Sequence, residues 1–202
     1  MYDVVAIGEL LVDFACRSTD DDGYPVLAAH PGGAPANFLA VLARYGLKTA
    51  LLAKVGNDAF GRLLRRTMER EGIDTAGVVV DDAAFTTLAF VTLDENGERD
   101  FSFARKPGAD MLLRYDELDL SLIDRTRVFH FGSVSMTDEP SRDATRRAAA
   151  YARSRGGLLT YDPNLRIPLW KDLAQARQEM LWGLSMADVV KLSDEEAAFL
   201  WE

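Results

Sequence analysis

The chain has 202 residues, of which 48% are hydrophobic and 27% charged, and it carries a formal net charge of −9 at pH 7. These proportions are ordinary for one globular domain and too apolar for a disordered chain. The acidic balance argues against a nucleic-acid or anionic-membrane partner, because both require a basic protein surface.

Targeting and redox signals are few. No run of residues approaches the roughly 18 apolar residues that a membrane span requires, and the N-terminus lacks the basic region of a signal peptide. Cys16 is the single cysteine, so an intrachain disulfide is excluded and a cytoplasmic location is expected. His30 and His130 are far apart in the sequence, so a transition-metal site is not expected.

Short apolar runs alternate with amphipathic segments along the chain. Runs typical of buried parallel strands are residues 4–8, 49–55, 77–80, 128–132, 158–162 and 189–192. Segments with helical patterns are residues 35–45, 58–71, 140–155, 173–186 and 194–201. Asp58 is expected to cap a helix, and Gly46, Gly72 and Gly156 occupy positions where helices end. This alternation predicts one α/β domain over residues 1–202, with a parallel sheet covered on both faces.

One region breaks the alternation. Residues 85–93 and 98–105 flank an Asn-Gly pair within 94–97, which favours a tight hairpin turn. In the second arm Phe101, Phe103 and Arg105 share one face by the period of two. An aromatic face that carries a cation is typical of a lid over a polar ligand. We expect a lid from approximately 13–30 and 85–105, with short strands at 14–16 and 26–29.

A glycine pair precedes the first expected helix. Gly32 and Gly33 would let the backbone approach a ligand closely, and the helix N-terminus offers unpaired N–H donors. No Gly-Lys-Ser/Thr follows, so the loop predicts no phosphate site by itself. Asn37 can both donate and accept hydrogen bonds, which suits a polyol. The alternative interpretation is a tight strand-to-helix connection.

Two polar groups are expected at the ends of strands. Asp13 comes just after the first expected strand, at the edge where open α/β sheets bind ligands, and could accept two sugar hydroxyls. A surface-loop aspartate is the alternative. The run Asp162-Pro163-Asn164-Leu165-Arg166 follows another apolar strand and groups an acid, an amide and a guanidinium. A proline turn is its competing interpretation.

Taken together, these motifs resemble the ribokinase-like (PfkB) carbohydrate kinases. Residues 32–37, Gly46 and Gly56 follow that family's N-terminal signature in order and spacing. Segments similar to fructokinases in particular are residues 102–105, 109–113, 129–133 and 162–170. The resemblance covers essentially the whole chain. It implies a three-layer ribokinase-like α/β fold with a mostly parallel sheet and a small β-sheet lid, and phosphorylation by ATP of the primary 6-hydroxyl of fructose.

The resemblance also implies roles for individual residues. The implied sugar ligands are Asp13, Gly32, Gly33, Asn37, Phe103, Arg105, Asn164 and Arg166. Arg105 would reach in from the lid, and Arg166 would also stabilise the transferred phosphate. Lys191 would lie near the ATP phosphates, and Glu196 would act on Mg²⁺ through water, although Ser193 replaces the Asn of the family's Asn-x-x-Glu motif. Family lids often pair, so a homodimer through the lid is an option.

The family's catalytic Gly-Ala-Gly-Asp motif has no match in residues 1–202. Asp58 belongs to the N-terminal signature and is not assigned as the general base, which is expected beyond Glu202. The 202-residue chain alone is therefore expected to be inactive. Two alternatives stay open. One is a kinase of another sugar, such as 2-keto-3-deoxygluconate or ribose, and the other is a non-catalytic sugar-binding module.

Overall fold

The apolar runs expected to be strands form one parallel sheet. The computed structural model describes residues 1–93 and 99–202, and within these ranges the sheet has seven strands. They are β1 (Tyr2–Ile7), β4 (Thr49–Gly56), β5 (Ile73–Asp74), β6 (Val78–Asp81), β9 (Thr126–Phe131), β10 (Leu158–Tyr161) and β11 (Val189–Val190). Their order is β11-β10-β9-β1-β4-β5, with β6 also paired to β4. All six apolar runs that predicted strands are confirmed, whereas no apolar run predicted the two-residue β5.

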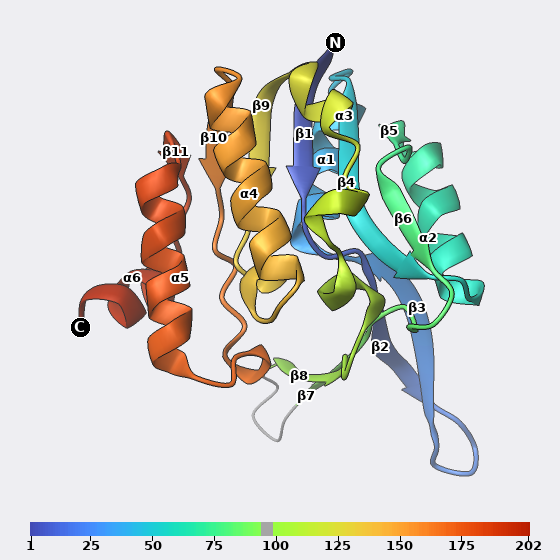
Figure 1. Ribbon diagram of the computed structural model, residues 1–202. Helices are drawn as coiled ribbons and strands as arrows, with labels where there is room; N and C mark the ends of the chain where they lie inside the picture. Colours follow the sequence, from blue (N-terminus) through green and yellow to red (C-terminus); the bar gives the residue numbers. More distant parts are fainter. Residues whose placement is uncertain (94–98) are drawn as a thin grey trace.

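Helices cover both faces of this sheet (Figure 1). They are α1 (Ala34–Arg44), α2 (Ala59–Arg70), α3 (Leu120–Asp124), α4 (Ser141–Ser154), α5 (Leu173–Met186) and α6 (Asp194–Trp201). Short 3₁₀ turns are η1 (Ala109–Leu112), η2 (Tyr115–Glu117), η3 (Val134–Met136) and η4 (Ile167–Leu169). In the part of the chain that the structure describes, every helix is too short or too polar to span a bilayer.

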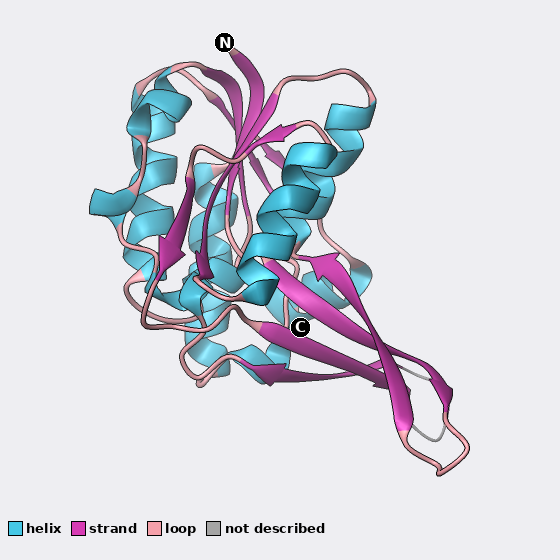
Figure 2. Cartoon of the chain, turned by 90° about the vertical axis from the view of Figure 1, so that its right-hand side faces the viewer, coloured by secondary structure: helices cyan, strands magenta, loops and turns pink. Residues whose placement is uncertain are grey.

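Alternation along β1 divides the core into two layers. Val5 and Ile7 pack with residues of α3, α4 and α5, whereas Val4 and Ala6 pack with residues of α1 and α2. Successive side chains of a strand point to opposite faces, so one strand supplies both cores. The predicted three-layer α/β arrangement is confirmed, and Figure 2 shows helices on either side of the sheet.

The predicted helix ends are also confirmed. The Asp58 carboxylate accepts hydrogen bonds from the N–H groups of Phe60 at 2.9 Å and Gly61 at 2.8 Å, at the start of α2. The glycines expected at helix ends all have positive φ, which favours glycine there, and they are Gly46, Gly72 and Gly156. Local hydrogen bonding and backbone sterics therefore decide these boundaries.

A second sheet projects from the body (Figure 2). Its strands are β2 (Leu11–Thr19), β3 (Pro25–Gly32), β7 (Leu88–Leu93) and β8 (Arg99–Ala104), in the order β3-β2-β7-β8. β2 and β3 are longer than expected because they pair along eight register positions despite their largely exposed side chains. The turn expected at 94–97 lies outside the described residues.

This sheet corrects the placement of one predicted site residue. Asp13 does not follow a strand of the parallel sheet; it lies inside β2, where it is paired with His30 of β3 and Ala89 of β7. The chain passes from β1 to β2 through only three residues, so the carboxylate comes from the smaller sheet.

Candidate functional site

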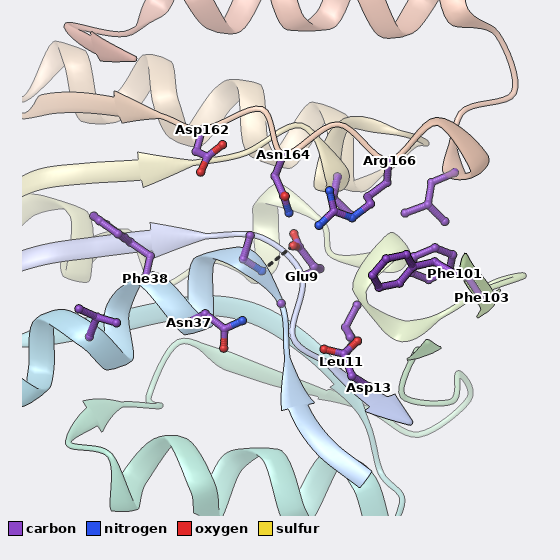
Figure 3. Close-up of a pocket in the computed structure, with 15 residues that line it drawn as sticks. Glu9, Leu11, Asp13, Asn37, Phe38, Phe101, Phe103, Asp162, Asn164 and Arg166 are labelled. Carbon is purple, nitrogen blue, oxygen red and sulfur yellow. Dashed lines mark hydrogen bonds between the residues drawn. The ribbon is translucent and has the colours of Figure 1, made fainter. Parts of the chain in front are cut away.

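A cavity of about 500 Å³ lies where the carboxyl ends of the central strands meet the smaller sheet (Figure 3). Its lining comes from the loop after β1, from β2 and β8, from the start of α1, and from the loop after β10. The lining residues are Glu9, Leu11, Asp13, Gly33, Ala34, Asn37, Phe38, Val41, Phe101, Phe103, Val134, Asp162, Asn164, Arg166 and Leu169. Open α/β sheets bind ligands at this edge.

The two glycines before α1 have different tasks. Gly33 has φ 111°, and a Cβ built on it would lie 2.3 Å from the main-chain oxygen of Glu9, so the turn requires glycine. Gly32 does not line the cavity. A Cβ there would lie 2.3 Å from Oδ2 of Asp13, so Gly32 makes room for that carboxylate. One turn into α1, the Asn37 side chain lines the cavity (Figure 3).

Asp13 and Arg166 bring opposite charges to the cavity. Burial raises the pKa of Asp13, and the positive charge of Arg166 partly opposes that rise. The Arg166 guanidinium lies 5.6 Å from the centroid of the Phe101 ring, and Phe101 stacks on Phe103 with centroids 6.2 Å apart. The cavity therefore has an aromatic wall from β8 with a cation beside it.

The loop after β10 is held in place by hydrogen bonds. The carbonyl of Pro163 accepts from the N–H of Ser133 at 2.9 Å and from its hydroxyl at 2.6 Å. The N–H of Leu165 donates to Oε1 of Glu196 at 2.8 Å. Between these anchors Asn164 has φ 49°, a left-handed conformation that Asn tolerates better than most residues. This conformation presents Asn164 to the cavity.

Arg105 does not reach into the cavity, which corrects the expectation of a lid cation above the ligand. Only 5% of the residue is exposed. Its Nε donates to Oδ2 of Asp110 at 2.8 Å, and one terminal nitrogen lies 2.7 Å from the same oxygen. Its remaining donors bond to Oγ1 of Thr137 at 2.8 Å and to the carbonyl of Val134 at 3.1 Å. The side chain joins the end of β8 to η1 and η3.

No sequence pattern singled out Glu9, which lines the cavity and is only 4% exposed. Its Oε1 accepts a hydrogen bond from the N–H of Ala34 at 2.9 Å. Burial raises the pKa of Glu9 to about 7. The sequence feature that could have identified Glu9 is an acid between the apolar runs of β1 and β2. A loop that only connects two strands does not require a carboxylate there.

A second cavity of about 400 Å³ lies beside the first and shares Asn164 and Arg166 with it. Lys191 and Ser193 also line it. Lys191 is mostly exposed, and its Nζ lies 3.3 Å from the Asp162 carboxylate. Arg166 therefore lines two adjoining spaces, the first of which combines apolar walls with acid and amide side chains.

Glu196 ties the start of α6 to the loop after β10. Oε1 accepts from Leu165 N–H at 2.8 Å, and Oε2 accepts from Ser193 N–H at 2.8 Å. Ser193 in turn caps α6 by accepting from the N–H of Glu196 at 3.2 Å. Among the described residues, no group of three or more His, Cys, Asp or Glu side chains is arranged to hold a metal ion.

Known proteins resemble this chain along its whole length. The sequence model of the pfkB family carbohydrate kinases matches residues 1–202. Fructokinase-1 of Zea mays is 46% identical over 199 residues, which cover 98% of this chain and 62% of that protein.

Solved structures of fructokinases are also similar to this chain. The crystal structure of fructokinase from Xylella fastidiosa superimposes with a TM-score of 0.91 at 34% identity, over 99% of this chain and 62% of that one. The same fructokinase with bound ATP has a TM-score of 0.89 at 34% identity, over 99% of this chain and 61% of that one. The chain thus spans less than two thirds of the length of these proteins.

Proposed function

The chain belongs to the pfkB family of carbohydrate kinases, and on that premise we propose that the complete protein is an ATP-dependent kinase that phosphorylates the 6-hydroxyl of fructose. The main support is the pair of adjoining cavities that share Arg166. One offers groups that bind hydroxyls, and the other is open to the phosphates of a nucleotide. Named fructokinases are similar over this region.

The first cavity would hold the sugar. The Asp13 carboxylate accepts hydrogen bonds from hydroxyls, and the amides of Asn37 and Asn164 both donate and accept them. The backbone at Gly33 has no side chain to keep a sugar away. Phe101 and Phe103 cover the opposite wall with apolar surface, which excludes water from the reacting hydroxyl.

The second cavity would hold phosphates of ATP, which when bound supplies the phosphoryl group. Arg166, between the cavities, would stabilise the negative charge of the group in transfer. Lys191 and Ser193 are the further donors on this side. Asp58 is not proposed as a base, because its carboxylate caps α2 and also accepts from Thr86 N–H at 2.7 Å.

Magnesium belongs to the proposal only indirectly. Both carboxylate oxygens of Glu196 already accept backbone hydrogen bonds, so this side chain would act on Mg²⁺ through water. The described residues do not by themselves form a magnesium site, and no step is assigned to the metal. Isothermal titration of Mg²⁺ with and without ATP tests this role: a nucleotide-dependent signal that Glu196→Gln weakens supports it, and equal signals contradict it.

The charges of the cavity favour a neutral sugar over an acid sugar such as 2-keto-3-deoxygluconate. The acids of the lining are Glu9, Asp13 and Asp162, and Arg166 is the one base among the described lining residues. The cation expected from the lid, Arg105, is paired with Asp110. A carboxylate in the cavity would therefore meet like charges in a partly desolvated space. Ribose stays an open alternative.

Calorimetric titration of fructose into the 202-residue chain tests the sugar assignment, with 2-keto-3-deoxygluconate and ribose as competitors. We expect saturable fructose binding that Asp13→Asn weakens at least about tenfold, since a hydrogen bond to a charged group is lost. Asp143→Asn on α4, where the side chain is 55% exposed, is the matched control and should leave affinity unchanged. A folded chain that binds no neutral sugar would contradict the proposal.

Two further expectations remain predictions. A cytoplasmic location is one, tested by fractionation of the source cells. Pairing of two copies through the smaller sheet is the other, and exposed apolar residues of β3, Val26 and Leu27, support it. Sedimentation at several concentrations would show a dimer that Leu27→Asp weakens.

A further inference from the structure

Glu9 is a buried acid that the proposed chemistry does not use. It follows β1 and precedes β2, so it lies at the junction of the two sheets. In Figure 3 its carboxyl group lies centrally among the labelled side chains, with Asn164 and Arg166 to one side and Asn37 to the other. A carboxyl group in this place borders the space that a sugar would occupy.

Glu9 also holds the glycine turn in two ways. Its side chain accepts from the N–H of Ala34 at 2.9 Å, in the first turn of α1. Its main-chain oxygen packs so closely on Gly33 that a Cβ there would lie 2.3 Å away. The conformation of the turn and the start of α1, which carries Asn37, therefore depends on the position of Glu9.

Burial affects the pKa of Glu9 more than the surrounding charges do. Arg105 and Asp110 act in opposite directions, and they are paired with each other at 2.7 Å. Asp13, Asp162 and Arg166 are the other charged groups among the described residues that line the cavity. Desolvation outweighs the hydrogen bond from Ala34 and raises the pKa of Glu9 to about 7.

We propose that Glu9 is a positioning residue of the sugar site, whose ionised carboxylate fixes the Gly33–Ala34 turn and accepts a hydrogen bond from a sugar hydroxyl. This inference rests on the proposed function of the cavity as a sugar site. The Ala34 N–H donates to the carboxylate, and a sugar hydroxyl that donates to it as well stabilises the charged form. Sugar binding and proton release are therefore coupled.

The expected pH dependence follows from the fraction of Glu9 that is ionised. With a pKa of about 7 in the sugar-free protein, roughly a tenth of the molecules are ionised at pH 6 and nearly all at pH 8. Apparent affinity scales with the competent fraction, so fructose should bind about tenfold more tightly at pH 8 than at pH 6. At pH 7 binding should release about half a proton.

The experiment is titration calorimetry of fructose into the 202-residue chain at pH 6, 7 and 8, in two buffers of different ionisation enthalpy. Glu9→Gln keeps an oxygen for the Ala34 N–H but cannot ionise. It should bind fructose with an affinity that changes less than about twofold between pH 6 and 8, and with no proton release. Glu139→Gln, on an exposed acid, is the matched control and should behave as the wild type.

Three outcomes would overturn the inference. A pH-independent wild type would show that Glu9 does not titrate with sugar binding. A Glu9→Gln variant that keeps the tenfold dependence and the proton release would assign both to another group, such as Asp13. Absence of fructose binding at every pH by a folded wild-type chain would instead overturn the proposed function itself, and this inference with it.

Discussion

Replacing Arg105 by Met should destabilise the protein by about 3–5 kcal/mol, because it leaves the Asp110 carboxylate buried without its cation. The side chains of this pair are only 3% and 2% exposed, so water cannot replace the lost partner. The substitution also removes the donors to Thr137 at 2.8 Å and to the Val134 carbonyl at 3.1 Å. The end of β8 would lose its attachment to η1 and η3.

Chemical denaturation and thermal melting of the purified chain measure this effect. For a protein of this size, the expected loss corresponds to a fall in Tm of roughly 10 °C. The double variant Arg105→Met, Asp110→Leu should recover much of the stability, because it leaves no unpaired buried charge. Arg114→Met is the control: Arg114 and Asp116 form an exposed pair, and its loss should cost less than about 1 kcal/mol.

The alternative role of Arg105 predicts a different pattern. If Arg105 bound the sugar directly, Arg105→Met would abolish fructose binding and leave the unfolding free energy close to that of the wild type. That result would refute the argument that the guanidinium serves as an anchor of the smaller sheet. A loss of stability that the double variant reverses would support it.

Three other substitutions should give measurable effects. Lys54→Met should cost about 3 kcal/mol at pH 7, because Lys54 is 4% exposed and lies 2.9 Å from Asp81. The hydrogen bond from Lys54 is the main reason that the pKa of Asp81 is lowered to about 2. Above pH 4 the variant should therefore lack the stability that ionised Asp81 gives the wild type, and it should unfold in acid at a higher pH than the wild type. Glu9→Gln should stabilise the sugar-free protein by up to about 3 kcal/mol at pH 8 and by much less at pH 5. The reason is that the raised pKa of Glu9 makes the wild type lose stability as the pH rises from 4.5 through 7. Melting curves at pH 5 and pH 8 check this. Gly32→Ala should weaken fructose binding at least about tenfold in titrations, because the new methyl group displaces the Asp13 carboxylate; unchanged affinity would exclude that carboxylate as a ligand.

Much of the candidate site was predictable because its residues adjoin strand and helix ends. Asn37, Asn164 and Arg166 all line the cavity, as the resemblance to sugar kinases implied. Each lies within a few residues of the end of a strand or the start of a helix, and these ends are marked by nearby glycine, proline or capping residues. The parallel strands then bring these boundaries to the same edge of the sheet.

The positions of the buried charged groups were not predictable in this way. Arg105 shares the alternation of Phe101 and Phe103, yet its guanidinium bonds to Asp110 and Thr137 instead of lining the cavity. Strand periodicity gives only the face of a side chain and ends where the strand ends, at Ala104. Which acid meets the guanidinium depends on the turn at η1.

The amino-acid sequence alone predicted six strands of the parallel sheet, five of the helices and the cap at Asp58, because these depend on the spacing of apolar residues and on hydrogen bonds within a few positions. It did not predict β5 or α3, which are only two and five residues long. Only the tertiary structure decided that Asp13 belongs to the smaller sheet and that Glu9 meets Ala34 across 25 positions of the chain. The physical reason is that burial and partners determine what a charged side chain does. Both arise from contacts between segments that are distant in the sequence.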